Sequence, residues 1–340
     1  MKKLGLVSAF VGLFVMACFG QAQYVNPMVG TDGHGHTYPG AIVPFGGVQV
    51  SPDTRLDGWD GCSAYHYSDN VVYGFSHTHL SGTGCSDYGD ILLMPFTGKP
   101  SLKNTEYCSK FSHQNEIAQA GYYSVVLDKN NVKVELTAST HVGVHQYTFP
   151  NSKGSKGVII DLTHRDKVIS SGMSFQDNEI LGWRESEAWN PHQYCAFSLV
   201  ASQPIKNIEF YKDNKLVDAQ QVRGENCKAV VYFQDNVRQV VLKVAISGTD
   251  LQGAHANQSE LTNFDFNAVR KDATALWNKE LSKIEITDAN TENLKVFYTA
   301  LYHSFTSPYL FTDVDGRYRG TDNQIHTTDK GHQIYTVFSL

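Results

Sequence analysis

Strand alternation is clearest in the stretch Val132-Lys133-Val134-Glu135-Leu136. Its apolar side chains fall on one face of an extended segment and its charged side chains on the other, because successive residues of a strand point to opposite faces. Wholly apolar runs, which are typical of strands covered on both faces, occur at Val158–Leu162, Ala229–Phe233 and Val240–Ile246. Turn residues such as Asp128-Lys129-Asn130-Asn131 separate the runs. The pattern predicts a mainly β fold, a large antiparallel β-sandwich over residues 24–258.

The period of the apolar residues changes near Glu260 from that of strands to that of helices. One stripe of an amphipathic helix is formed by Val269, Ala273, Leu276, Trp277 and Leu281. A second helical face is formed by Leu294, Phe297, Leu301 and Phe305. We expect a helical linker over residues 259–289 and the start of a second, helical domain over residues 290–340. Because the last apolar run reaches Leu340 without a cap or a polar tail, we expect this domain to be cut short.

Composition sets the class of protein. A chain of 340 residues is expected to hold about two domains of about 150 residues each. Its 34 acidic residues exceed its 28 basic ones, and the net charge of −6 gives no general attraction for nucleic acid or an anionic membrane. With 12% aromatic and only 18% charged residues, the chain is expected to bury a sizeable core rather than to be disordered.

The N-terminus resembles an export signal. Lys2 and Lys3 precede an apolar run, Leu4–Ala17, that is too short to span a bilayer. Cleavage after Ala22 would remove a signal peptide of residues 1–22, so we expect an exported protein, periplasmic or secreted. The alternative is an outer-membrane lipoprotein, because Val15-Met16-Ala17-Cys18 resembles a lipobox that would place a lipid anchor on Cys18. No other stretch of the sequence is long and apolar enough to form a transmembrane span.

Candidate binding residues are densest between Asp57 and Asp90. In Trp59-Asp60, an exposed indole could pack on the C–H face of a pyranose while the carboxylate accepts hydrogen bonds from hydroxyls. The alternative is a core tryptophan beside a turn-forming aspartate. His77 and His79 would share one face of a strand, as two zinc or copper ligands do. The alternative is that both histidines bond the backbone beside the tight loop Gly82-Thr83-Gly84.

Other motifs carry weaker signals. If His77 and His79 bind zinc, the third ligand of the ion would be Asp87 or Asp90. The stretch Gly30–Gly40 lets backbone approach a ligand, or packs as an entry loop over the end of the sandwich. Arg184 and Trp189 are expected at a solvated hairpin tip. Asp313-Val314-Asp315-Gly316 looks like half a calcium loop, but the later glutamate of an EF-hand is missing, which favours a polar turn.

Several short sequence blocks, taken together and in order, resemble one known protein family. The N-terminal blocks are Asn26-Pro27-Met28-Val29-Gly30-Thr31, Pro39-Gly40-Ala41, Pro44-Phe45-Gly46, Ser51-Pro52-Asp53-Thr54, Gly58-Trp59-Asp60, Ser63-Ala64-Tyr65-His66-Tyr67 and Gly74-Phe75-Ser76-His77-Thr78-His79-Leu80-Ser81-Gly82-Thr83-Gly84. The C-terminal blocks are Phe297-Tyr298-Thr299-Ala300-Leu301-Tyr302-His303, Asp315-Gly316-Arg317-Tyr318-Arg319-Gly320 and Tyr335-Thr336-Val337-Phe338-Ser339-Leu340. In this order they resemble glycoside hydrolase family 92 from Tyr24 to Leu340.

The resemblance implies an exo-acting α-mannosidase, mostly one that cuts α-1,2-linked mannose from N-glycans or mannan. It implies an N-terminal β-sandwich, a helical linker and an (α/α)₆ toroid, together with a calcium ion. It also implies an inverting mechanism, in which one carboxyl group protonates the leaving oxygen and a second activates water. In the family both carboxyl groups come from the toroid, in cis, so they and most calcium ligands are expected beyond Leu340.

The chain as given is therefore expected to be a fragment without turnover, in which no catalytic residue and no metal ligand is assigned. By analogy the sandwich supplies one wall of the sugar pocket, and the predicted substrate-binding residues are Trp59, Asp60, His77 and His79. The expected partners are mannose-containing glycans. Two alternatives remain: a non-catalytic carbohydrate-binding β-sandwich module, and a zinc protein built on the two histidines.

Overall fold

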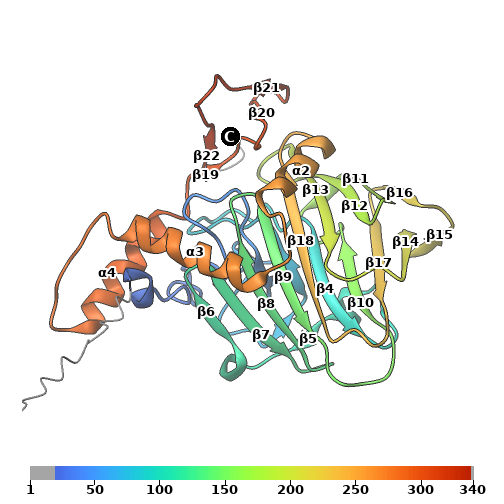
Figure 1. Cartoon of the computed structure of the whole chain (residues 1–340), viewed down its shortest axis with the longest axis horizontal. Coiled ribbons are helices and arrows are strands. Elements are labelled where there is room, and N and C mark those ends of the chain that lie inside the picture. The colour runs from blue at the N-terminus through green and yellow to red at the C-terminus, as the bar shows by residue number, and fades with distance from the viewer. Residues whose placement is uncertain (1–19, 338–340) are drawn as a thin grey trace, which may run out of the picture.

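The computed structural model describes residues 20–337. Two antiparallel sheets pack face to face. The helix of residues 266–281 starts against the outer face of the larger sheet, and the helix of residues 291–304 lies beyond the edge of the sandwich (Figure 1). Residues 1–19, with the lipobox cysteine Cys18, lie outside the described residues. The predicted cleavage site after Ala22 falls in a short 3₁₀ helix, η1 (Gln21–Tyr24), where the Ala22 N–H donates to Asn278 Oδ1 at 2.9 Å. No helix within residues 20–337 is long and apolar enough to cross a membrane.

The larger sheet has nine strands. In spatial order they are β16 (Gln221–Gly224), β11 (Lys167–Gln176), β12 (Glu179–Glu187), β13 (Gln193–Ala201), β18 (Gln239–Ser247), β9 (Val142–Thr148), β8 (Val132–Ala138), β7 (Tyr122–Leu127) and β6 (Ile117–Gln119). The alternation that opened the sequence analysis lies in β8, where Val132, Val134 and Leu136 are fully buried and Lys133 is exposed. The prediction of a mainly β antiparallel sandwich is confirmed.

The smaller sheet has seven strands. They are β1 (Ser51–Asp53), β3 (Gly74–Ser76), β4 (Leu92–Thr97), β10 (Lys156–Asp161), β17 (Cys227–Phe233), β14 (Asn207–Lys212) and β15 (Lys215–Val217). The apolar runs in β10 and β17 pair with each other in its centre, with Ile159 opposite Val230. The main hydrophobic core lies between the two sheets, where these runs meet the inward side chains of β7, β8 and β18.

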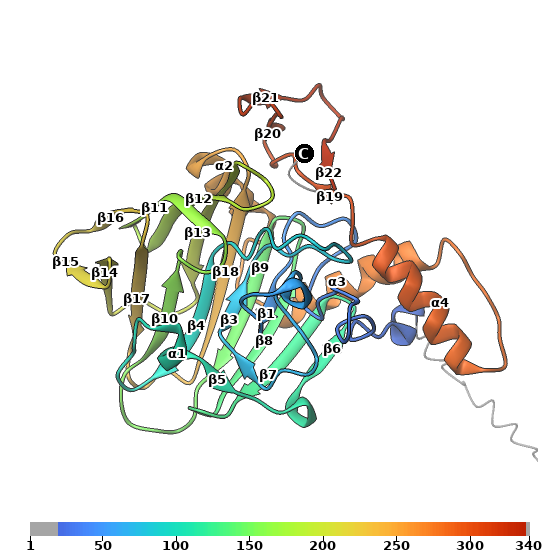
Figure 2. The same ribbon diagram turned by 180° about the vertical axis from the view of Figure 1, so that it is seen from behind.

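Short pairs of strands and short helices complete the described chain. The pairs are β2 (Val71–Val72) with β5 (Ser109–Lys110), β19 (Tyr309–Leu310) with β22 (Tyr335–Thr336), and β20 (Arg317–Arg319) with β21 (Ile325–Thr327). The short helices are η2 (Trp59–Gly61), α1 (Asn104–Tyr107), η3 (His113–Asn115), α2 (Leu251–Asn257) and η4 (Gln258–Glu260). The segment that carries β20 and β21 projects beyond the sandwich near α2 (Figure 2), and its Arg319 donates to the Gly248 carbonyl at 2.7 Å.

The two longer helices are α3 (Phe266–Leu281) and α4 (Thr291–Ser304). Each begins at a side-chain cap, since Asp265 accepts from the Ala268 N–H and Asn290 from the Glu292 N–H. Most of the predicted stripe of α3 is buried, but Leu276 is exposed because it lies at the edge of the stripe. In α4 the buried face is centred on Tyr298 and Tyr302 rather than on Phe297 and Leu301, which are only partly buried.

Candidate functional site

The exposed indole of Trp59 is the centre of the candidate site. Trp59 begins η2 directly after Gly58, whose φ of +79° suits glycine and turns the next side chain outward. The side chain is 59% exposed, although Trp normally buries most of its surface. The ring edge of His36 packs on the indole at a centroid distance of 4.4 Å, and the His34 ring lies at 5.1 Å. An exposed flat ring is thus held in place from one side.

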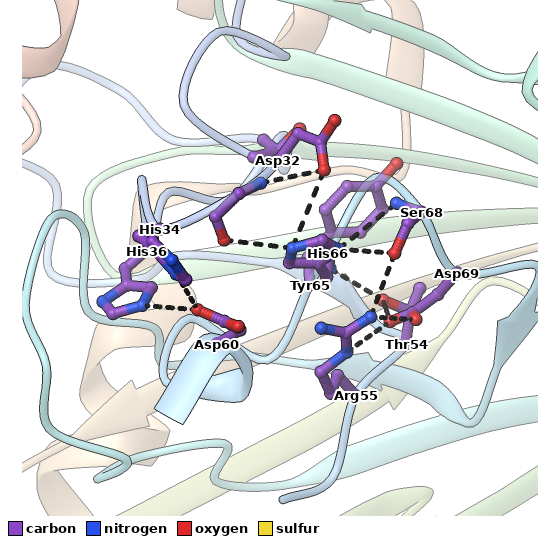
Figure 3. A network of polar contacts seen from close by, with 12 residues as sticks. Asp32, His34, His36, Thr54, Arg55, Asp60, Tyr65, His66, Ser68 and Asp69 are labelled. Atoms are coloured by element: carbon purple, nitrogen blue, oxygen red, sulfur yellow. Dashed lines mark hydrogen bonds and ion pairs between the residues drawn. The ribbon is translucent and has the colours of Figure 1, made fainter. Parts of the chain in front are cut away.

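Asp60 follows Trp59 in the chain, and Figure 3 shows its carboxylate facing His34 and His36. Its Oδ1 atom accepts a hydrogen bond from His34 Nδ1 at 2.6 Å and lies 3.5 Å from His36 Nε2. The hydrogen bond from His34 is the main reason that the pKa of Asp60 lies below its ordinary value. Asp60 is therefore an ionised hydrogen-bond acceptor at neutral pH, next to an apolar aromatic surface.

His36 reaches this site from the glycine-rich stretch Gly30–Gly40. Its ring is buried, and its Nδ1 donates to the Thr83 carbonyl at 2.8 Å. Its Nε2 faces the Asp60 carboxylate at 3.5 Å, so His36 also contributes to the lowered pKa of Asp60. Gly35 is required for the loop geometry, because a Cβ there would lie 2.1 Å from the Gly30 carbonyl oxygen.

The loop is fastened to the sandwich by His66. Its Nε2 donates to the Gly33 carbonyl at 3.1 Å, and its Nδ1 lies 2.8 Å from Ser68 Oγ. His34 and His36 were not among the residues predicted from the sequence. The signal that could have found them is Gly33-His34-Gly35-His36, in which the two histidines are spaced to meet one carboxylate. The stretch Gly30–Gly40 thus brings side chains, as well as backbone, to the site.

His77 does not lie at this site, contrary to the sequence prediction. It is fully buried between the sheets, and its Nδ1 donates to the Ile91 carbonyl at 2.7 Å. Its Nε2 is therefore the acceptor for His145 Nε2 at 2.9 Å, and His145 Nδ1 in turn accepts from the Tyr147 hydroxyl at 2.9 Å. This chain of bonds is fully satisfied when both imidazoles are neutral. The alternative weighed for His77, a histidine bonded to backbone, describes it better.

His79 is also buried, so it cannot line the exposed surface beside Trp59. Its Nδ1 donates to the Gln49 carbonyl at 2.9 Å, and its Nε2 lies 2.6 Å from Asp53 Oδ1. The other oxygen of Asp53 lies 2.5 Å from His164 Nε2. Burial alone would raise the pKa of Asp53, but His164 and His79 hold it well below its usual range. The cluster is a buried charge network of the sandwich.

The zinc hypothesis gains no support from this geometry. Asp87 accepts from the Asn190 N–H at 2.7 Å, and Asp90 accepts from the Thr78 hydroxyl at 2.9 Å. His77 and His79 point to different partners. Among residues 20–337, no three His, Cys, Asp or Glu side chains are arranged to hold a metal ion.

Arg184 is fully buried, so the prediction of a solvated hairpin tip is wrong for this residue. It lies in the middle of β12, where alternate residues face the core. Its guanidinium forms an ion pair with Asp90 and donates to the carbonyls of Leu162 at 3.1 Å and His164 at 2.8 Å. Trp189, beyond the end of β12, is 66% exposed. Only the tryptophan of this pair is open to solvent.

The buried histidine pair predicts a pH dependence of stability. Burial lowers the pKa of His77 to about 4 and that of His145 well below its ordinary value. Because the unfolded chain takes up protons below about pH 6.5, the stabilisation is complete above that pH. It is lost as the pH falls towards 4, at up to about 1.4 kcal/mol per pH unit for each histidine.

The measurement is urea unfolding of the wild type and of His145→Asn between about pH 7 and pH 5. The comparison uses the difference between the two proteins, because Asp166, whose pKa is raised to about 7 by burial, titrates in the opposite sense over this window. We expect the stability advantage of the wild type to shrink as the pH falls. The exposed His255, as His255→Asn, is the control. If the difference in free energy of unfolding between the wild type and His145→Asn stays constant with pH, His77 and His145 are not a buried neutral pair.

Comparisons with known proteins give the family. The model of the glycosyl hydrolase family 92 N-terminal domain matches residues 24–247, and that of the family 92 catalytic domain matches residues 253–340. An uncharacterized secreted glycosidase of Arthroderma benhamiae is 26% identical over 338 residues, with 85% of this chain and 42% of the relative covered. The predicted domain limits of 24–258, 259–289 and 290–340 stay a prediction.

Solved structures agree with the sequence matches. A family 92 α-mannosidase of Bacteroides thetaiotaomicron, in complex with mannoimidazole, superposes with a TM-score of 0.89 at 36% identity, over 93% of this chain and 44% of that one. A family 92 inverting mannosidase of the same organism gives 0.83 at 26% identity, over 94% and 44%. The chain thus spans less than half the length of these relatives. It belongs to glycosyl hydrolase family 92.

Proposed function

We propose that the chain is the sandwich-bearing part of an exported, inverting exo-α-mannosidase, with α-1,2-linked mannose of N-glycans or mannan as the substrate. The observation that carries the proposal is the exposed Trp59 beside the ionised Asp60, on the sandwich of a family 92 member. The relative that binds mannoimidazole and the one described as inverting support the sugar and the stereochemistry. The secreted glycosidase of Arthroderma benhamiae supports export.

In this proposal the indole of Trp59 packs against the C–H face of the sugar, and the Asp60 carboxylate accepts hydrogen bonds from its hydroxyls. His36 holds the indole edge-on, and its Nδ1 is fixed on the Thr83 carbonyl, so the ring cannot rotate without losing that bond. His34 donates to Asp60 and keeps the carboxylate oriented. These groups bind and orient the sugar; the acid and the base of the reaction are proposed to come from the toroid.

Calcium belongs to the proposal as the cofactor that the family implies. The described residues do not fit an acidic calcium cage, since no three His, Cys, Asp or Glu side chains among them are grouped so that they could hold an ion. Asp313, which begins the half calcium loop, is buried, and its Oδ2 already accepts from the hydroxyls of Ser247 and Thr249 at 2.6 Å each. We therefore propose that most of the calcium ligands lie beyond Leu340.

A non-catalytic carbohydrate-binding module is the second candidate, because the exposed Trp59 sits on a β-sandwich that could hold a mannoside without cutting it. Activity separates the two candidates. The chain as given, residues 1–340, is expected to show no turnover. The same chain extended to the length of the family structures should release mannose from α-1,2-mannobiose and lose activity with a calcium chelator. An extended protein that hydrolyses nothing, or that ignores the chelator, would overturn the enzymatic proposal.

Trp59→Ala provides the test of the binding residue. Truncation of a tryptophan that anchors a bound partner typically costs about 2 kcal/mol or more, so kcat/KM for α-1,2-mannobiose should fall about 30-fold or more in the extended protein. The matched control is Phe264→Ala, an exposed aromatic residue near the start of α3. Equal kcat/KM values for the two variants would show that Trp59 does not contact the substrate.

A further inference from the structure

His141 joins three parts of the chain that are far apart in the sequence. It lies in the turn between β8 and β9, and only 6% of its surface is exposed. Its Nδ1 lies 2.6 Å from Glu260 Oε1 at the end of η4, and its Nε2 lies 2.9 Å from the Thr312 carbonyl oxygen beyond β19. One imidazole therefore contacts the sandwich, the linker and the segment that follows α4.

Both ring nitrogens of His141 carry a proton in this arrangement. The Thr312 carbonyl oxygen can only accept, so Nε2 is a donor. Glu260 also accepts, because burial alone would raise its pKa but the hydrogen bonds from His141 and Ser139 hold it below its ordinary value. Its Oε2 takes the Ser139 hydroxyl at 2.6 Å and the His141 N–H at 3.0 Å. An imidazole that donates through both nitrogens is an imidazolium.

The neighbouring charges favour the imidazolium. Burial alone would lower the pKa of His141, but the hydrogen bond and the charge of Glu260 raise it above its ordinary value, and Asp313 acts in the same direction. Asp313 is itself buried, one residue after Thr312. The turn of residues 139–141 carries no other ionisable side chain. Negative charge thus meets the ring from the linker and from the segment after β19.

The remaining ionisable groups around His141 line a cavity of about 50 Å³ beside it. They are three phenols and one thiol: Tyr88, Tyr194, Tyr309 and Cys195. Burial raises the pKa of Tyr194 to about 12 and those of Tyr309 and Cys195 above their ordinary values. Phenols and a buried thiol are neutral near pH 7. His141 is therefore the group at this junction that changes charge just above neutral pH.

The contacts of His141 cross from one domain of the family to the other. His141 belongs to the part of the chain that matches the N-terminal domain, residues 24–247, whereas Glu260 and Thr312 belong to the part that matches the catalytic domain, residues 253–340. Thr312 also begins the segment that carries β20 and β21. The position of this segment against the sandwich thus depends in part on one imidazolium.

We propose that His141, Glu260 and Thr312 form a pH-dependent clasp between the two domains. A neutral imidazole has one N–H and must give up one of the two partners. Because folding favours the proton, the stabilisation is complete below the pKa of histidine in an unfolded chain, about 6.5, and is lost as the pH rises through the pKa of His141. The segment that begins at Thr312 should therefore open more often as the solution becomes alkaline.

NMR of the chain with isotope-labelled histidine measures the protonation of His141 directly. Its signals are identified by their absence from the spectrum of His141→Gln. We expect both ring nitrogens to carry protons at about pH 6.5, and the midpoint of the titration to lie above that value. A midpoint at or below about 6.5 would overturn the clasp, because the ring would then be neutral while both partners are in place.

Trypsin cleavage after Arg319 measures the opening of the segment, because the cleaved bond must first leave its folded surroundings. In the closed segment the Arg319 guanidinium donates to the carbonyls of Gly248 and Thr249. Dividing the rate for the wild type by that for His141→Gln at the same pH cancels the pH dependence of trypsin. We expect this ratio to rise between about pH 6.5 and pH 8.5, at most about 10-fold for each unit by which the NMR midpoint exceeds 6.5.

Two further variants complete the experiment. His141→Arg keeps a cation at every pH, so its cleavage should stay slower than that of His141→Gln throughout the range. The matched control is His255→Gln, an exposed histidine that pairs with Glu179 at 2.9 Å and should follow the wild type. If the wild type and His141→Gln change with pH in parallel, the clasp is overturned, whatever His141→Arg does. Neither measurement uses activity, so their failure would leave the proposed function standing.

Discussion

Replacing Arg184 by alanine is expected to lower the free energy of unfolding by about 3–5 kcal/mol, because removal of one partner of a buried ion pair leaves the other charge uncompensated. Both side chains of the Arg184–Asp90 pair are fully buried. The guanidinium also donates to the carbonyls of Leu162, His164 and Arg165 and to the Ser186 hydroxyl. All of these acceptors would lose a donor in a place that solvent water does not reach.

Urea unfolding of Arg184→Ala, its control, and a double variant with its two single changes measures this effect. The control is Arg223→Ala, an exposed arginine on β16 whose guanidinium lies over the Trp183 ring at 5.5 Å, and its loss should be below about 1 kcal/mol. The double variant Arg184→Met with Asp90→Asn should be less destabilised than the sum of the single changes, because no lone charge remains. A loss for Arg184→Ala as small as that for Arg223→Ala would contradict the buried pair.

The sheets were predictable because the alternation of apolar and polar residues along a strand can be read from the local sequence. In β8 the buried and exposed residues alternate as the sequence does, and β10 is apolar because both of its faces are covered. The same signal was present in β12, where Ile180, Gly182, Arg184 and Ser186 form the inward row. The arginine conceals this row, because a charged side chain by itself predicts a position that faces solvent. The inward position is possible only because Asp90, distant in sequence, meets the guanidinium.

The site was predictable only where it is local in sequence. Trp59 and Asp60 are neighbours, so their joint chemistry can be read from the chain. His34 joins Asp60 from 26 positions away, and His36 is fixed by Thr83, so the motif Gly33-His34-Gly35-His36 shows that two histidines are near each other but not which side chains they meet. For His77 and His79 the sequence spacing gave the wrong prediction. Their spacing suggested a shared surface, but the chain turns after β3 and each histidine finds its own buried partners.

Trp277→Ala is expected to be the second strongly destabilising change, with a loss of about 3–5 kcal/mol for a large aromatic side chain removed from a core. Trp277 is fully buried, and its Nε1 donates to the Ile42 carbonyl at 2.6 Å. Its ring lies 4.3 Å from that of Tyr302, so it connects α3 to α4 as well as to the sandwich. The cavity would therefore open where three parts of the chain meet.

The neighbouring Leu276 offers a matched control on the same helix. It is 42% exposed, so Leu276→Ala removes an apolar side chain from α3 without opening the core and should change stability by less than about 1 kcal/mol. Urea unfolding of both variants gives the comparison. Because Trp277 also orients α4 through Tyr302, the extended protein with Trp277→Ala should lose the proposed mannosidase activity at temperatures where Leu276→Ala keeps it. Equal stability of the two variants would mean that the helices are held to the sandwich by contacts other than the buried indole.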